Sequence, residues 1–99
     1  MTMREVYFGE FRLIVVRHIK EIEAASPQSH TTEWFLLKYL RRIAKNANPP
    51  TTPGRMESSM RGLIRFYVDN IEENTLLGEQ CRFIYEAYVK TLRQSKEEE

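Results

Sequence analysis

Aromatic and basic side chains share one side of the segment from residue 31 to residue 45, and together they could bind a partner. Burying a large apolar side chain stabilises a protein by about 1.5–3 kcal/mol, so we expect another surface to cover these rings. At about 100° per residue in a helix, the predicted contact face comprises Trp34, Phe35, Lys38, Arg41, Arg42 and Lys45.

Three interpretations of this face stay open. In a protein interface, Trp34 and Phe35 would be buried anchors, because aromatic residues and Arg dominate binding hot spots. In a nucleic-acid interface, the rings would stack on bases and the cations would meet phosphates. In the third case, Trp34 packs against the neighbouring helices and the cations stay in water. The net charge of +1 gives the whole chain no strong attraction to nucleic acid.

A second set of large apolar residues lies off the main helical stripes. Wide apolar patches are rare on monomers, so we predict that these residues extend a seam between two copies of the chain and that the protein is a homodimer. The predicted dimer seam comprises Val6, Leu13, Val16 and Phe66.

Residues that could support catalysis or bind a metal are isolated from one another. His18 lies at the edge of an apolar stripe, and Cys81 lies on a stripe that faces the core. No third ligand stands at metal spacing, so we expect no metal and no cofactor. Arg12, Arg61 and Arg65 flank core stripes, where they could bind an anionic metabolite or extend into solvent. We expect a protein that is not an enzyme; the alternative is a small all-helical enzyme that binds an anionic metabolite through these arginines.

Composition is typical of one helical domain spanning residues 1–99. The chain is 41% hydrophobic and has four Gly and four Pro, too few turn residues for an all-β fold. The apolar run at residues 13–16 lies between two arginines and is too short to cross a bilayer. One cysteine cannot form an intrachain disulfide. We therefore expect no membrane association and a cytoplasmic location.

Apolar residues at helical spacing predict an all-α fold of four amphipathic helices. We expect them at about 4–25, 32–47, 53–71 and 75–95, packed as two antiparallel hairpins in a four-helix bundle. A Pro-rich connection at 48–54 separates the hairpins, and an acidic tail at 96–99 should fray. Ile71 and Leu77 are six residues apart, or about 600°, so a turn or a marked kink must separate helices three and four; the pattern leaves both open.

Side-chain phase and capping residues make the prediction more specific. Thr31 or Thr32, Thr52, and Asn74 or Thr75 are candidate N-caps. Phe66 and Gly62 fall off the stripe of the third helix. The residues that we expect to face the core from that helix are Met56, Met60, Leu63, Ile64, Tyr67, Val68 and Ile71.

These observations favour a small interaction, adaptor or regulatory module that binds a protein partner. Its mechanism would be aromatic anchoring in a groove of the partner, with a basic rim that sets orientation. The alternative function is a nucleic-acid-binding regulator that uses the same face.

Overall fold

Helices form nearly the whole of the described chain. The computed structural model describes residues 3–48 and 52–97, with side chains from 5 to 48 and from 52 to 96. The four helices are α1 (Met3–Ala24), α2 (Thr32–Asn46), α3 (Pro53–Asn70) and α4 (Leu76–Glu97). Every predicted helix is present, and each end lies within two residues of its expected position. The helix α4 continues into the predicted tail, whose last two residues, like residues 49–51 of the Pro-rich connection, lie outside the described residues.

Three of the helices begin at a threonine that caps free backbone N–H groups. The Thr31 hydroxyl accepts a hydrogen bond from the backbone N–H of Trp34 at 3.3 Å. The Thr52 hydroxyl accepts one from Arg55 at 3.2 Å, and Pro53 follows it in the first turn of α3. Side-chain oxygens at this position satisfy donors that have no partner within the helix. The capping chemistry therefore explains why α2 and α3 begin at these residues.

Helices α3 and α4 form a hairpin and not one kinked helix. Its turn ends at Thr75, which caps α4 by accepting from the Gly78 N–H at 3.1 Å. Gly78 is buried against this turn. A Cβ atom at Gly78 would lie 2.5 Å from the carbonyl oxygen of Glu72 and 2.9 Å from that of Glu73. The tight approach of the turn to the helix thus requires glycine.

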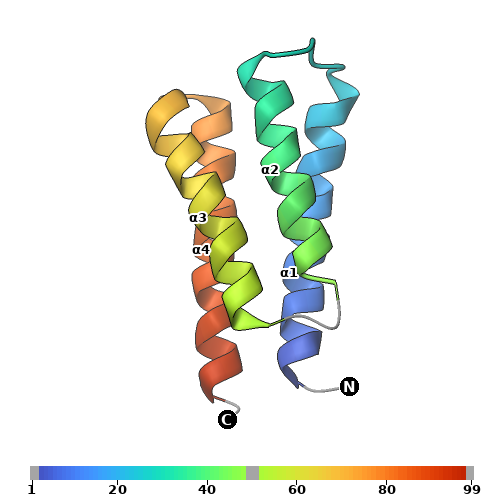
Figure 1. The fold of residues 1–99 in the computed structure, drawn as a ribbon, viewed down its shortest axis with the longest axis vertical. Coiled ribbons are helices and arrows are strands. Elements are labelled where there is room, and N and C mark those ends of the chain that lie inside the picture. Colours follow the sequence, from blue (N-terminus) through green and yellow to red (C-terminus); the bar gives the residue numbers. More distant parts are fainter. Residues whose placement is uncertain (1–2, 49–51, 98–99) are drawn as a thin grey trace.

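The two hairpins pack side by side as a four-helix bundle, with the start of α1 and the end of α4 at the same end (Figure 1). Helix α2 packs against α1 and α3, and α1 packs against α4. The backbones of α3 and α4 approach each other closely at far fewer places. Three sides of the bundle are therefore tightly packed, whereas the side between α3 and α4 is more open.

Large apolar side chains from all four helices meet along the axis of the bundle and form one core. The largest fully buried ones are Phe8, Phe11 and Val15 of α1, Leu36, Leu40 and Ile43 of α2, Met56, Met60 and Leu63 of α3, and Ile84 of α4. Their spacing of three or four residues along α1, α2 and α3 is the pattern that predicted the fold. The core thus explains why the helices form and leaves the outer faces available for binding.

The predicted orientation of α3 is wrong for three residues. Ile64 and Val68, expected in the core, are 37% and 71% exposed, whereas Phe66, expected off the stripe, is only 9% exposed. Phe66 packs on Tyr39 of α2, with ring centroids 4.9 Å apart. Two turns earlier on α3, Ser59 is also buried and accepts a hydrogen bond from the side chain of Asn46 on α2. These contacts with α2 turn the buried face of α3 away from Ile64 and Val68.

Candidate functional site

The predicted contact face on α2, here called the α2 strip (Trp34, Phe35, Lys38, Arg41, Arg42 and Lys45), begins with an aromatic cluster that its own chain partly covers. The half-buried ring of Trp34 lies 4.8 Å from that of His30 and 4.9 Å from that of Phe35. The ammonium of Lys38 lies 4.0 Å from the Trp34 ring centroid, in a cation–π contact. The cover expected over the indole therefore includes residues of α2 and of the loop before it.

Phe35 connects this cluster to the core. Its ring lies 6.4 Å from that of Phe66 on α3 and packs against the buried cluster. Phe35 thus contributes to the contact between the two hairpins. An aromatic ring with this many neighbours in its own chain has less surface to offer a partner.

The cations of the α2 strip differ in how far they are engaged. Arg41 forms an ion pair with Glu23 of α1, with Nη2 and Oε2 3.3 Å apart. Lys38 is held over Trp34, as described above. Arg42 and Lys45 are exposed, and the described residues provide no polar partner for either. The strip keeps a weak basic surface, while its aromatic anchors are largely engaged within the chain.

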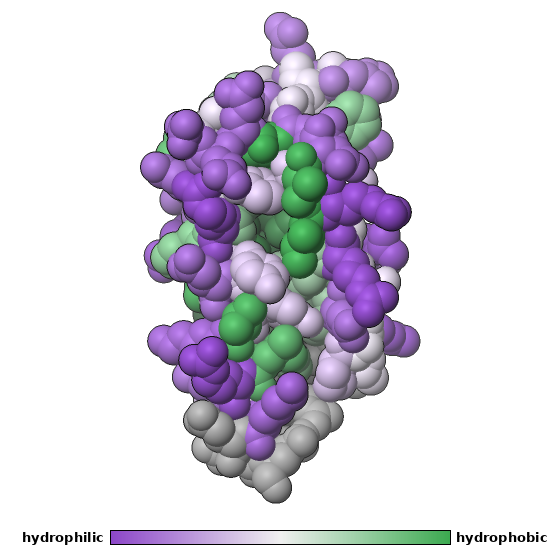
Figure 2. Space-filling view, turned by 90° about the vertical axis from the view of Figure 1, so that its left-hand side faces the viewer, coloured by the Kyte–Doolittle hydropathy of each residue, from purple (hydrophilic) through white to green (hydrophobic). Residues whose placement is uncertain are grey.

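A more open apolar surface lies between α3 and α4. We call it the α3–α4 groove. Its upper part is a hollow of about 220 Å³ lined by Leu63, Ile64, Tyr67, Val68, Cys81, Arg82 and Tyr85. An adjoining hollow shares Ile64 and Tyr85 and continues the groove past Met60, Tyr88 and Leu92 to Pro53 and Lys96. Figure 2 views the molecule from this side and shows hydrophobic residues along the middle of a hollowed face, between borders of charged residues.

Several side chains around the groove are unusually exposed for their type. Val68 and Ile64 of α3 are the two residues displaced from the core, and Tyr85 of α4 is 45% exposed. Cys81 lies on the floor, and its burial raises the pKa of the thiol to about 11. At neutral pH this cysteine is therefore a protonated, apolar part of the floor and a poor nucleophile.

Polar contacts hold the border of the groove in place. The Arg82 guanidinium donates hydrogen bonds to the Tyr67 hydroxyl at 3.3 Å and to the Glu73 carbonyl oxygen at 2.7 Å. Arg61 pairs with Glu57 at 2.7 Å, one turn away on α3. Four cations (Arg61, Arg65, Arg82 and Lys96) and two carboxylates (Glu57 and Asp69) line the groove and the outer side of Ile64 and Val68. The border is therefore more basic than acidic.

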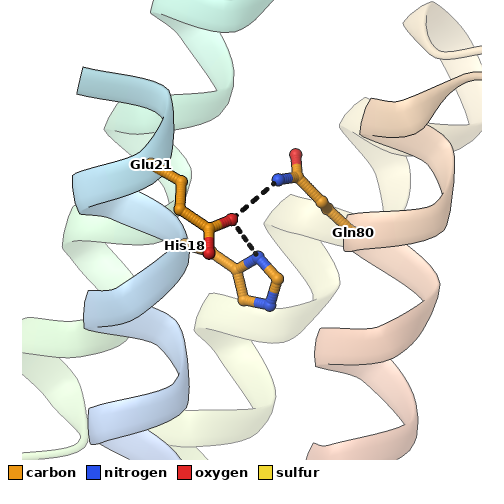
Figure 3. Close-up of polar contacts among 3 residues, drawn as sticks. All are labelled: His18, Glu21 and Gln80. Atoms are coloured by element: carbon orange, nitrogen blue, oxygen red, sulfur yellow. Dashed lines mark hydrogen bonds and ion pairs between the residues drawn. The ribbon is translucent and has the colours of Figure 1, made fainter. Parts of the chain in front are cut away.

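A polar cluster joins α1 to α4 on another side of the bundle (Figure 3). The Gln80 amide donates a hydrogen bond to the Glu21 carboxylate at 3.3 Å, and His18 Nδ1 lies 3.8 Å from the same oxygen. The His18 ring also packs on Phe83, with centroids 5.6 Å apart. Burial lowers the pKa of His18 and outweighs the attraction of Glu21, while Arg17 lowers it further. The ring is therefore neutral at pH 7, and its contact with Glu21 is not an ion pair.

This pKa shift predicts how the stability of the protein depends on pH. The folded state resists protonation at His18, whereas the unfolded chain binds the proton near the ordinary pKa of 6.5. The contribution of His18 to the free energy of unfolding should therefore be constant well above pH 6.5 and should become less favourable as the pH drops from 6.5 to the lowered folded-state pKa. Urea unfolding between about pH 8 and pH 5 measures this dependence of the free energy of unfolding on pH. The same measurement on the His18→Gln variant is the matched comparison. Equal slopes for both proteins would contradict the assignment.

The arginines considered for an anionic metabolite do not form one site. Arg12 of α1 donates a hydrogen bond from Nε to the Ala44 carbonyl oxygen of α2 at 3.2 Å. Arg61 and Arg65 lie on the outer face of α3, where Arg61 is paired with Glu57. In the described part of the chain, no group of three or more His, Cys, Asp or Glu side chains could hold a metal ion.

Phe66 is separated from the other three residues of the predicted dimer seam, which lie on α1. Leu13 is 64% exposed on α1, whereas Val16 packs partly against the core. Val6 is half-buried, and Phe66 lies between α2 and α3. Phe66 is therefore not available to a second copy of the chain. A homodimer could use at most the other three residues of the predicted seam.

The sequence analysis did not identify Tyr85 as part of a binding surface. A signal was present, because Phe83 and Tyr85 are two residues apart and therefore about 200° apart on a helix. Two such rings cannot both face one core. In the structure, Phe83 lies beside His18 and Tyr85 lies in the α3–α4 groove, and both are exposed.

Comparison with known proteins identifies no relative. No protein-family model, curated protein or solved structure matches the chain. Among the described residues, no helix is both long enough and apolar enough to span a bilayer.

Proposed function

We propose that this chain is a non-catalytic helical interaction module, of the adaptor or regulatory kind, that binds a protein partner through the α3–α4 groove. The observation that supports the proposal is the group of large apolar side chains exposed together there: Ile64, Val68 and Tyr85. Contiguous apolar patches on folded domains are typically binding sites, and Tyr and Arg are enriched in hot spots. Tyr67, Tyr85 and Arg82 supply both residue types.

The mechanism that we propose is apolar anchoring with a charged border. Side chains of the partner would enter the groove between α3 and α4 and displace water from Val68 and Tyr85. The arginines at the border would orient the partner and exclude partners of the wrong charge. The α2 strip is a weaker candidate because Lys38 already covers the Trp34 ring. The same engagement disfavours the nucleic-acid alternative, which needs free aromatic faces on which bases can stack.

Site-specific photocrosslinking tests the proposal. A photoreactive amino acid replaces Val68 in the groove, Arg42 on the α2 strip or Leu13 on α1, all of which are exposed. In extract of the source cells, we expect the Val68 probe to capture one protein that the Leu13 probe does not. The captured protein is then purified and its binding to the unmodified chain is measured, with Val68→Glu as the disrupted variant.

Each outcome of this experiment is informative. Binding that Val68→Glu abolishes supports the proposal. Crosslinks between two copies of the chain would identify the function as self-association through the groove. Capture from Arg42 but not from Val68 would move the contact surface to the α2 strip. No protein captured from Val68, or equal capture from Leu13, would overturn the proposal.

A further inference from the structure

We propose that the segment bound in the α3–α4 groove is an amphipathic helix of a partner protein that carries acidic residues along both edges of its apolar face. This inference rests on the proposed function and names the class of partner. It follows from the shape of the groove, its lining and the charges along its border.

The shape of the groove fits a helix. The two hollows that share Ile64 and Tyr85 run between two antiparallel helices, from Val68 and Arg82 at one end to Pro53 and Lys96 at the other. The wall formed by α3 is 18 residues long, or about 27 Å at 1.5 Å per residue. A guest helix of similar length would lie along both walls as a fifth helix, on the side between α3 and α4, whose backbones approach each other at fewer places than those of the other neighbouring helices.

The lining fits the apolar face of such a helix. Aliphatic and aromatic side chains occupy the floor and the inner walls: Met60, Leu63, Ile64, Tyr67, Val68, Cys81, Tyr85, Tyr88 and Leu92. Grooves of this type bind helices through apolar anchors at positions i, i+3, i+4 and i+7. Since Val68 is 71% exposed, a guest side chain would bury much surface that is now in water.

The border favours an acidic guest over a second copy of the chain. The residues that line the groove and the outer side of Ile64 and Val68 include four cations and two carboxylates, and one of those carboxylates, Glu57, already binds Arg61. A two-fold pairing of this face with itself would bring like-charged borders together. Acidic residues on the edges of a guest helix would instead meet Arg65, Arg82 and Lys96.

Two synthetic peptides test the charge and the helix together. Each is about 18 residues long and has the same Leu and Ile residues at i, i+3, i+4 and i+7. One carries Glu along both edges of the apolar face, and the other carries Lys at the same positions. Fluorescence anisotropy with the full chain gives the Kd of each. We expect the acidic peptide to bind at least about tenfold more tightly than the basic one. The ratio of the two Kd values should shrink as the salt concentration is raised.

Three variants locate the site. Val68→Glu should weaken the binding of the acidic peptide by more than about tenfold, because the substitution places a carboxylate among the apolar anchors. Leu13→Glu is the matched control, since it makes the same change at an exposed apolar residue of α1, and should leave Kd unchanged. Arg65→Gln should weaken the binding of the acidic peptide and should not weaken the binding of the basic peptide. Circular dichroism melts establish that each variant is folded.

The outcomes separate this inference from the proposed function. The basic peptide could bind as tightly as the acidic one or more tightly, and lose this binding in Val68→Glu. That result would overturn the acidic class of partner but would leave the groove as a binding site. Binding of neither peptide, or equal loss in Leu13→Glu, would count against both. Competition by a single-stranded oligonucleotide of similar length, or a dimer that Val68→Glu dissociates, would also overturn the acidic helix as the occupant.

Discussion

Replacing Phe11 with alanine is expected to lower the free energy of unfolding by about 3–5 kcal/mol. Phe11 is 1% exposed, and its ring lies 5.9 Å from that of Tyr88 on α4. The substitution would therefore leave a cavity between α1 and α4. Because domains of this size have about 5–15 kcal/mol of stability, the loss is a large fraction of the total. Chemical denaturation followed by circular dichroism measures it.

Leu13 provides the control for this prediction. It lies two residues from Phe11 on the same helix but is 64% exposed. Leu13→Ala should change the free energy of unfolding by less than about 0.5 kcal/mol. If both substitutions destabilise the protein equally, the orientation assigned to α1 is incorrect.

Gly78→Ala is expected to destabilise the protein by about 1–3 kcal/mol. The added Cβ would lie 2.5 Å from the Glu72 carbonyl oxygen and 2.9 Å from that of Glu73. These are backbone atoms of the α3–α4 turn, so the contact cannot be relieved by a side-chain rotation. Either the turn moves or the first turn of α4 is displaced, with loss of the Thr75 cap. Thermal and urea unfolding of the variant measure the effect.

Gly9→Ala is the matched substitution of opposite sign. Gly9 lies inside α1, and apart from its chain neighbours and the local backbone of the helix, no described atom lies within 4 Å of the position where a Cβ would be added. Alanine should therefore stabilise the helix by up to about 1 kcal/mol. If Gly78→Ala were also stabilising, the close approach between the turn and α4 would not exist in solution.

Helix positions could be predicted from the sequence because local chemistry determines them. Threonine caps at Thr31, Thr52 and Thr75, and a proline at residue 53, occur where helices begin. The phase difference between Ile71 and Leu77 required a change of direction, and the structure has a turn there. These signals act within a few residues and do not depend on what each helix packs against.

The rotation of α3 could not be predicted in the same way. Its apolar residues cover a wider arc than one neighbouring helix can bury, so periodicity alone does not select the buried part. Phe66 enters the core because Tyr39 and Phe35 of α2 lie beside it, and Ser59 is buried because Asn46 donates to it. Those partners lie 13 to 31 residues away in the chain, and their positions depend on the tertiary fold.

The α2 strip illustrates a related limit. The sequence correctly indicated that Trp34 and Phe35 needed cover. It did not indicate that His30 and Lys38 would lie against the indole or that Phe35 would pack on Phe66. The requirement for burial follows from residue type, whereas the source of the cover depends on rotamers and on the path of the preceding loop. The role of the strip in binding stays a prediction.

The bundle separates stability from the proposed binding function. The core is buried by the contacts of α2 with α1 and α3 and by those of α1 with α4. Between α3 and α4 a groove lined mostly by apolar side chains remains. Residues such as Val68 are displaced from the core, so changing them should alter binding far more than folding. Binding and stability can therefore be measured separately in this protein.

The measurement that distinguishes most directly between the α3–α4 groove and the α2 strip is a backbone amide NMR titration of the labelled chain with the acidic helical peptide. We expect the chemical shifts to change along residues 60–68 of α3 and 81–92 of α4, with little change along residues 34–45 of α2. Changes concentrated along residues 34–45, or no changes at a saturating peptide concentration, would contradict the assignment of the groove as the binding site.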